Sequence, residues 1–167
     1  MSNLALPKID QSILAKKDTI ISNLKKITNS ENVLSEDDEV KAYETDSLLA
    51  YKQKPLVVVL PENTLEVSKI LKYCNENKIK VIPRGAGTGL SGGALPLQDG
   101  VLISLGKFNK ILEIDFDNNC VVTQPGVTNL SITHSVQHKD LYYAPDPSSQ
   151  IVCSIGGNVA ENSGGVH

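Results

Sequence analysis

Apolar residues near the start of the chain recur with the spacing of a helix. The first such set consists of Ile9, Ile13, Ile20, Leu24 and Ile27. These positions lie mostly along one side of a helix, so the pattern predicts an N-terminal amphipathic helix over residues 9–27. Further along, the Ser35 hydroxyl precedes the acidic residues 36–38, and both features favour a helix start. We therefore expect a second, short helix from Ser35 to about Tyr43.

A β-α-β unit is predicted over residues 56–83. Residues 56–60 form a continuous apolar run between two prolines, which is typical of a strand buried on both faces of a parallel sheet. Asn63 and Glu66 have the spacing of a capping box at the start of the next helix. The core stripe expected on that helix comprises Val67, Ile70, Leu71 and Cys74. A second short strand follows at 80–83, and the crossover between the two strands is expected to be right-handed.

The second half of the chain predicts a further strand, a hairpin and a helix. Residues 101–105 form another buried strand, and residues 112–116 then alternate between apolar and acidic side chains. A turn at 117–119 leads into residues 120–124, which predicts an antiparallel hairpin. Thr128 is suited to cap a helix that runs to about Lys139. Beyond it the chain is rich in Pro, Ser and Gly, and the pattern names no further helix or strand.

Composition limits the domain count and the class of partner. With 167 residues, 40% of them hydrophobic and 21% charged, the chain has the size and balance of an ordinary globular domain. A net charge of −3, no Trp and two Phe argue against binding nucleic acid or anionic lipid. The start of the chain has no apolar signal core, and the longest strongly apolar run is too short to span a bilayer. We expect a soluble protein, and the match to a glycosylation acceptor at 129–131 is then without function.

The three cysteines favour a reducing compartment. Cys74, Cys120 and Cys153 are an odd number, lie far apart and show no spacing of metal ligands. The expected location is therefore the cytoplasm. His134 and His138 lie four residues apart on the predicted helix, but no HExxH pattern or third ligand accompanies them, so surface or packing roles are favoured over a metal site. The acidic residues 37–39 are likewise interpreted as a solvated helix start, and no metal is expected.

Glycines are concentrated in the second half of the chain. All 12 lie between Gly85 and Gly165, and five fall within residues 85–93. This loop follows the second predicted strand, and ligands of open α/β sheets bind at the carboxyl ends of strands. Without Cβ atoms, successive backbone N–H groups can turn toward one point and form an anion nest that suits a pyrophosphate. A glycine-rich surface turn is the alternative.

Two familiar phosphate-binding loops do not fit this segment. Gly87, Gly89 and Gly92 satisfy G-x-G-x-x-G, but a Rossmann loop opens a helix, whereas the glycines and Pro96 break any helix here. A Walker A loop is excluded because Phe108 follows Lys107 where Ser or Thr is required. The loop is therefore expected to bind phosphate in another way, and we predict that Gly87→Val abolishes retention of the ligand by blocking the backbone approach to its pyrophosphate.

A second cluster of candidate ligands lies near the end of the sequence. Residues 144–149 contain two prolines, which make the segment stiff and extended and present hydroxyls and a carboxylate. Residues 153–165 contain two glycine pairs and two asparagine amides. Such a set offers many neutral hydrogen bonds and little charge, as a flat heterocycle with carbonyl and imino edges requires.

Residues 83–93, 143–149 and 153–165 together resemble the flavin-binding domain of the vanillyl-alcohol-oxidase-type FAD-linked oxidases, also described as the p-cresol methylhydroxylase (PCMH) type. Within it the chain is most similar to D-type glycolate oxidase subunits and to D-lactate and D-2-hydroxyglutarate dehydrogenases. The resemblance spans roughly residues 40–167 and includes Tyr43 and Asp46. It implies an α+β fold with a small parallel β-α-β subdomain and the beginning of an antiparallel α+β subdomain, with FAD held between the two.

The resemblance also implies the cofactor contacts. The loop at 84–91 wraps the pyrophosphate, and residues 145–149 and 154–162 line the ribityl chain and the isoalloxazine. The residues assigned to FAD in this way are Arg84, Gly85, Ala86, Gly87, Thr88, Gly89, Ser91, Pro145, Asp146, Ser148, Ser149, Ser154, Gly156, Gly157, Asn158 and Asn162. Glu161 and Asp146 either touch the cofactor or cap local turns, and covalent attachment of flavin at His167 or Cys153 is a minor alternative. No catalytic side chain is assigned.

The implied activity is oxidation of a small 2-hydroxy acid, glycolate or D-lactate, by hydride transfer to FAD. Residues 1–50 are expected to form an N-terminal helical extension and residues 51–167 an FAD-binding domain that is truncated at its C-terminal end. Members of the family continue into a substrate domain, so we expect the substrate site mostly outside this chain, no activity of the chain alone, and companion oxidase subunits as possible partners. The alternative is a non-catalytic fragment or remnant that acts at most as a binding or interaction module.

Overall fold

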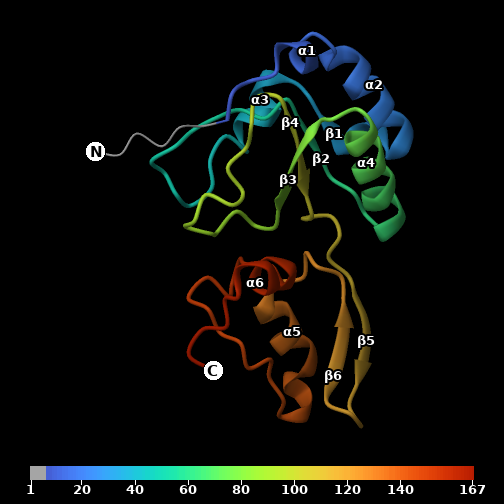
Figure 1. Ribbon diagram of the computed structural model, residues 1–167. Helices are drawn as coiled ribbons and strands as arrows, with labels where there is room; N and C mark the ends of the chain where they lie inside the picture. Colours follow the sequence, from blue (N-terminus) through green and yellow to red (C-terminus); the bar gives the residue numbers. More distant parts are fainter. Residues whose placement is uncertain (1–6) are drawn as a thin grey trace.

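A computed structural model of the chain describes residues 7–167, which form two lobes (Figure 1). The part of the predicted N-terminal extension before residue 7 lies outside the described residues. A four-stranded sheet forms the centre of the first lobe, and a two-stranded sheet belongs to the second. Figure 1 shows the first lobe in blue to yellow and the second in orange and red.

The four-stranded sheet has the order β1-β2-β4-β3. Its strands are β1 (Val33–Leu34), β2 (Val57–Val59), β3 (Lys80–Arg84) and β4 (Gly100–Ser104). β4 lies between β2 and β3 and is parallel to both, whereas β1 pairs antiparallel with β2. The predicted parallel sheet is confirmed, and it has an additional antiparallel edge strand. The carboxyl ends of β2, β3 and β4 consequently lie at one edge of the sheet.

Helices cover both faces of this sheet, because strand side chains alternate between the faces. Val57 and Val59 pack into a core shared with α1 (Gln11–Leu14), α2 (Lys17–Ile27) and α4 (Thr64–Glu76). Val58 and Leu102 pack on the opposite side against Val40 of α3 (Asp37–Lys41). β2 is therefore apolar at every position, and this is the property that identified it in the sequence.

The predicted helix over residues 9–27 is interrupted. The last turn of α1 tightens, with the Lys16 N–H bonded to the Ile13 carbonyl three residues back at 3.0 Å. α2 then starts after Lys16, whose φ is −100°. The Asp10 carboxylate caps α1 by accepting the Ser12 N–H, so Ile9 lies outside the helix. The buried side chains of these two helices are Ile13, Ile20 and Leu24. A 3-10 turn, η1 (Ser30–Asn32), leads into β1.

α3 starts later than predicted and ends earlier. Its cap is Glu36, whose side chain accepts from the backbone of Glu39. The Glu39 carboxylate in turn accepts from the N–H groups of Glu36 at 3.1 Å and Ser35 at 3.0 Å. This reciprocal capping box replaces the cap predicted at Ser35, and the helix ends before Tyr43.

α4 has the predicted cap but a narrower buried face than expected. The Asn63 side chain accepts the Glu66 N–H at 3.0 Å. Ile70 and Cys74 are buried against the sheet, whereas Leu71 is 45% exposed. The prediction that Leu71 belongs to the core is therefore wrong, because α4 presents the line through Ile70 and Cys74 to the sheet and Leu71 lies beside that line.

The second lobe contains the predicted hairpin and helix. The hairpin pairs β5 (Ile111–Asp115) with β6 (Cys120–Thr123) in antiparallel fashion. In its turn the Asp115 carboxylate accepts the Asn118 N–H at 3.0 Å, and Asn119 adopts a left-handed φ of 51°. The Thr128 hydroxyl caps α5 (Asn129–Val136), which continues as a 3-10 turn, η2 (Gln137–Lys139).

The chain then forms a helix that the sequence pattern did not predict. α6 (Ile155–Glu161) is capped by the Ser154 hydroxyl and ends at Asn162, whose φ of 54° is left-handed. Its first turn contains Gly156 and Gly157, and glycine has a low helix propensity, which hides the element from a sequence pattern. α6 places the second glycine cluster at the edge of the second lobe that faces the first lobe (Figure 1).

The crossing between the lobes requires glycine at one position. Any Cβ on Gly126 would overlap the Leu105 carbonyl oxygen and lie 2.7 Å from the Phe108 carbonyl oxygen. The Gly126 N–H also donates to the Phe108 carbonyl at 2.8 Å, so the returning chain packs directly on the outgoing one. Within residues 7–167, no helix combines the length and the apolar character needed to cross a bilayer.

Candidate functional site

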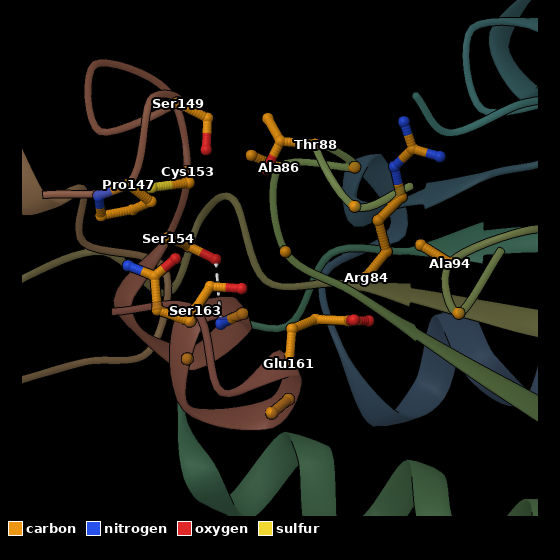
Figure 2. A pocket seen from close by; sticks show the side chains of 18 of the residues that line it. Arg84, Ala86, Thr88, Ala94, Pro147, Ser149, Cys153, Ser154, Glu161 and Ser163 are labelled. Carbon is orange, nitrogen blue, oxygen red and sulfur yellow. Dashed lines mark hydrogen bonds between the residues drawn. The ribbon is translucent and has the colours of Figure 1, made fainter. Parts of the chain in front are cut away.

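A cavity of about 590 Å³ lies where the two lobes face each other. Figure 2 shows residues of the glycine loop, such as Ala86 and Thr88, opposite residues of the second lobe, such as Pro147, Ser149 and Ser154. Its lining residues are Pro83, Arg84, Gly85, Ala86, Gly87, Thr88, Gly89, Leu90, Ser91, Gly93, Ala94, Leu105, Pro147, Ser148, Ser149, Cys153, Ser154, Gly156, Gly157, Asn158, Ala160, Glu161 and Ser163. The two sequence clusters thus face a single cavity.

The glycine loop has free backbone donors. It leaves β3 after Arg84, at the carboxyl edge of the parallel sheet. From Gly85 to Gly93, no backbone N–H donates a hydrogen bond to a protein group within residues 7–167. Backbone donors of this kind are normally satisfied by protein, water or a ligand, so the loop can donate to an anion in the cavity.

Two glycines of the loop adopt conformations that favour glycine. Gly87 has a φ of 75° and Gly92 a φ of 79°. A Cβ on Gly87 would overlap the Arg84 guanidinium, with the Cζ atom at 2.5 Å and Nε at 2.9 Å. The expected loss of function in Gly87→Val therefore has a different physical cause: the added side chain would displace Arg84 and strain the loop, rather than block the phosphate.

The loop and α6 touch at Gly85. A Cβ there would overlap the Ser154 hydroxyl oxygen and lie 3.8 Å from the Cα of Gly157. The same Ser154 hydroxyl accepts the Gly157 N–H at 3.3 Å and thereby caps α6. The neighbouring Gly156 packs against Pro125, and its N–H donates to the Pro125 carbonyl at 2.9 Å. This contact between the lobes therefore depends on the small size of Gly85.

A buried amide network fixes the second-lobe wall. Asn129 is 1% exposed, and its side-chain oxygen accepts from the Asn158 amide and from the Cys153 thiol. Its amide donates to the Pro145 carbonyl at 2.9 Å. Asn129 therefore ties α5 to α6 and to the proline-rich segment. In the sequence, Asn129 was notable only as part of a glycosylation pattern.

Glu161 reaches across the cavity from the end of α6. Its carboxylate accepts from the Ser91 hydroxyl at 3.0 and 3.2 Å. A Cβ on Gly93 would lie 2.9 Å from the same carboxylate, so the side chain rests on the glycine loop. Figure 2 shows Glu161 between the two walls. Of the two alternatives for Glu161, the geometry places it at the cavity rather than in a local turn.

Arg84 is the only cationic side chain among the lining residues, and its guanidinium points away from the second lobe (Figure 2). Its Nη1 donates to the Thr45 carbonyl at 2.7 Å, and its Cζ lies 5.5 Å from the centre of the Tyr43 ring. Burial lowers the pKa of the Arg84 guanidinium, and the negative charge of Asp46 only partly opposes this effect.

Thirteen of the 16 residues assigned to FAD line the cavity, and Pro145, Asp146 and Asn162 do not. The Asp146 carboxylate accepts from the N–H groups of Val166 and His167 and lies 2.9 Å from the His167 Nδ1. These hydrogen bonds, those from His167 first, lower the pKa of Asp146. Neither His167 nor Asp146 is a lining residue.

Several lining residues were not on the predicted list. Eight of them lie within residues 83–93, 144–149 or 153–165, which the sequence pattern had already singled out: Pro83, Leu90, Gly93, Pro147, Cys153, Ala160, Glu161 and Ser163. Ala94 and Leu105 lie outside these segments and have no polar signature, so only their tertiary position identifies them. Within residues 7–167, no three His, Cys, Asp or Glu side chains lie together as metal ligands.

Comparison with known proteins identifies the family of the chain. The family described as "FAD binding domain" matches residues 55–167. The chain is 48% identical over 163 residues to the glycolate oxidase subunit GlcD of Escherichia coli (strain K12), covering 98% of this chain and 32% of that protein. It is 43% identical over 135 residues to a D-lactate dehydrogenase of Anaerostipes hadrus, covering 80% of this chain and 28% of that protein. The chain thus spans about a third of the length of these relatives.

Solved structures agree with this assignment. A p-cresol methylhydroxylase with bound substrate aligns with a TM-score of 0.73 and 25% identity, covering 90% of this chain and 30% of that chain. A 4-ethylphenol oxidase from Gulosibacter chungangensis aligns with a TM-score of 0.74 and 26% identity, covering 92% of this chain and 30% of that chain. The predicted α+β fold of the PCMH type and the FAD cofactor are confirmed. The chain belongs to the FAD binding domain family.

Proposed function

We propose that this chain is the FAD-binding portion of a flavoenzyme that oxidises a small 2-hydroxy acid, glycolate or D-lactate. The observation behind this proposal is the single cavity in which the glycine loop and the second cluster face each other. The similarity to a glycolate oxidase subunit and a D-lactate dehydrogenase supports the substrate class. When bound, FAD would accept the hydride, and the chain would supply position and hydrogen bonds.

The residues present fit this cofactor. The unpaired N–H groups from Gly85 to Gly93 suit the pyrophosphate, because a loop without Cβ atoms lets phosphate oxygens approach the backbone closely. Ser148 and Ser149 offer hydroxyls at the opposite wall, and these would suit the hydroxyl groups of a ribityl chain. The thirteen lining residues of the predicted set are proposed to form the cofactor site, with Arg84 supporting the glycine loop, and Pro145 and Asp146 are proposed as supports of the second wall.

The domain bounds, the partners and the location expected from the sequence are also part of this proposal. We assign residues 51–167 to the FAD-binding domain and residues 1–50 to an N-terminal extension, in keeping with a family match that starts at residue 55. One relative is named as a subunit of glycolate oxidase, which supports the proposal that this chain has companion subunits. Cys74, Cys120 and Cys153 are all free thiols, which supports a reducing, cytoplasmic location. No catalytic side chain is assigned, and the 2-hydroxy acid would bind mostly outside this chain.

Titration of the purified, flavin-free chain with FAD tests the proposal. We expect saturable binding and a shifted flavin absorbance. Gly89→Leu adds a side chain to the cavity face of the loop, and its Cβ would lie in ordinary contact with the Glu161 carboxylate at 3.7 Å. It is expected to weaken FAD binding by about 10- to 100-fold, as the loss of one or two hydrogen-bonded contacts would.

Gly164→Ala is the matched control, because a Cβ at Gly164 meets nothing within 4 Å. It is expected to bind FAD as the unmodified chain does. A folded, unmodified chain that binds no FAD would contradict the proposal and favour a non-catalytic remnant. Equal FAD affinity of Gly89→Leu and Gly164→Ala would show that the cofactor lies elsewhere.

A further inference from the structure

The glycine loop is held from behind by residues 43–48, which do not line the cavity. Ser47 contacts the Gly87 carbonyl twice, through its N–H at 3.0 Å and its hydroxyl at 3.2 Å. The neighbouring Asp46 is 4% exposed, and its Oδ1 accepts the Leu48 N–H at 2.8 Å. Its Oδ2 is buried without a hydrogen-bond partner. This segment therefore brings a buried carboxylate and a backbone contact to the rear of the loop.

Arg84 joins the loop to the same segment. One guanidinium nitrogen donates to the Thr45 carbonyl at 2.7 Å, and the guanidinium lies over the Tyr43 ring at 5.5 Å. The nearby Asp46 carboxylate favours the charged guanidinium. Gly87 rests directly on this group, so closely that a Cβ would overlap it. The guanidinium thus lies between the loop and residues 43–48 and faces away from the cavity.

We propose that Arg84 is a positioning residue that holds the glycine loop in its nest conformation and is not itself a ligand of the cofactor's phosphates. The proposal rests on the proposed FAD site. Arg84 fixes the underside of Gly87 while Ser47 fixes its carbonyl, and the left-handed Gly87 then directs the following N–H groups toward the cavity. A diphosphate would accordingly be bound by backbone N–H groups and hydroxyls, without a cationic side chain.

The planar shape of arginine suits this role. A guanidinium can stack on an aromatic ring and donate in its own plane at the same time, whereas a lysine ammonium cannot do both. Lysine keeps the positive charge. Arg84→Lys therefore separates the two possible roles: a phosphate ligand is largely replaced by lysine, but a stacked support is not.

The experiment measures exchange of the amide hydrogen of residue 47, which is bonded to the Gly87 carbonyl, in the flavin-free chain, and FAD and riboflavin affinity, for Arg84→Gln, Arg84→Lys and Ser47→Ala. Without FAD, we expect this hydrogen to exchange about tenfold faster in both Arg84 variants, and Ser47→Ala, which loses only the hydroxyl contact, to show a smaller increase. FAD affinity is expected to fall by about 10- to 100-fold in both Arg84 variants, the range typical of lost supporting contacts. Riboflavin, which has no phosphate, is expected to bind all variants equally.

Lys139→Gln is the control for loss of a positive charge, since Lys139 is exposed and does not line the cavity. It is expected to change none of these measurements. Exchange of the residue 47 amide that is unchanged in the Arg84 variants, or FAD affinity restored by Arg84→Lys, would overturn the proposal. If the unmodified chain binds no FAD, the proposed function fails, while the exchange data without flavin still decide whether Arg84 supports the loop.

Discussion

At the scale of single residues, the two lobes meet at a contact that leaves no room for a side chain. Gly85 lies against the Ser154 hydroxyl, which is also the cap of α6. A methyl group at Gly85 overlaps the hydroxyl oxygen but would be 3.5 Å from the Ser154 Cβ, an ordinary contact. Within Ser154, only the hydroxyl oxygen clashes with the added methyl group, so a mutation that removes this oxygen should remove the clash.

We expect Gly85→Ala and Ser154→Ala to be non-additive. Gly85→Ala alone is expected to destabilise the chain by about 1–3 kcal/mol through overpacking, and Ser154→Ala by about 1 kcal/mol through loss of the cap. In the double variant the methyl group fits, so its free energy of unfolding is expected to equal that of Ser154→Ala. Urea denaturation of the four proteins measures this coupling. Strict additivity would show that the two residues do not touch.

A second residue-scale feature is the buried charge of Asp99. This side chain is 2% exposed and accepts from Lys80 Nζ and the Asp10 N–H, both at 2.7 Å. Burial by itself raises the pKa of Asp99, but the hydrogen bonds from Lys80 and the Asp10 backbone outweigh it, so the pKa is lowered. Asp99 thereby ties the segment before α1 to the start of β3 and β4.

This arrangement predicts a loss of stability in acid. Because the pKa of Asp99 is lower in the folded chain, its contribution is complete above the unfolded value of about 3.9 and is lost as pH falls through the folded value. Asp99→Asn is expected to cost about 1.5–3 kcal/mol near neutral pH, the range for hydrogen bonds to a charged group. The difference between the two proteins should shrink below about pH 4. Denaturation curves at pH 7 and pH 3 measure it, and an equal difference at both would contradict the assignment.

At the scale of elements, local chemistry explains the parts of the fold that were predictable. β2 was visible because Val57–Val59 is buried on both faces, and α4 because Asn63 supplies a cap before an apolar stripe. The break at Lys16 and the exposure of Leu71 could not be predicted, since each depends on how a helix is placed against the sheet. α6 was missed because two glycines stand in its first turn.

The two neighbours on α4 give an element-scale prediction. Ile70 is fully buried against the sheet, whereas Leu71 is 45% exposed. Ile70→Ala is expected to lower the free energy of unfolding by about 2–5 kcal/mol through a cavity. Leu71→Ala is expected to change it by no more than about 0.5 kcal/mol, as for a surface position. Thermal or urea unfolding compares the two, and similar losses would mean that α4 is rotated about its axis.

At the scale of the whole molecule, the two lobes are unequally packed. The two clusters of buried apolar side chains found within residues 7–167 take all their buried members from residues 13–103. The second lobe buries smaller groups of residues, including Ile132 and Val136 of α5. The site was predictable as two segments because each has its own glycine pattern, but the way they meet, and the role of Asn129 within the second wall, depend on tertiary contacts.

We therefore expect the second lobe to open first and FAD to close it. Without flavin, the hydrogen-bonded amides of β5, β6 and α5 are expected to exchange faster than those of β2, β3, β4 and α4, since less apolar surface holds them. FAD at about 100 times its Kd should stabilise the folded chain by about 2.7 kcal/mol. Where exchange requires the cavity to open, it should slow by about 100-fold in both lobes. Hydrogen exchange with and without FAD measures this, and protection of the first lobe alone would contradict it.

The burial of the thiols determines where a reporter can be attached. Cys74 and Cys153 are buried, and burial raises the pKa of Cys74 to about 11, whereas Cys120 on β6 is exposed. A maleimide dye is therefore directed to Cys120, on the second lobe. The chain has no Trp to compete for excitation or emission. Energy transfer between a flavin in the cavity and a dye at Cys120 would then report the spacing of the lobes in solution, in the natural sequence and without any added cysteine.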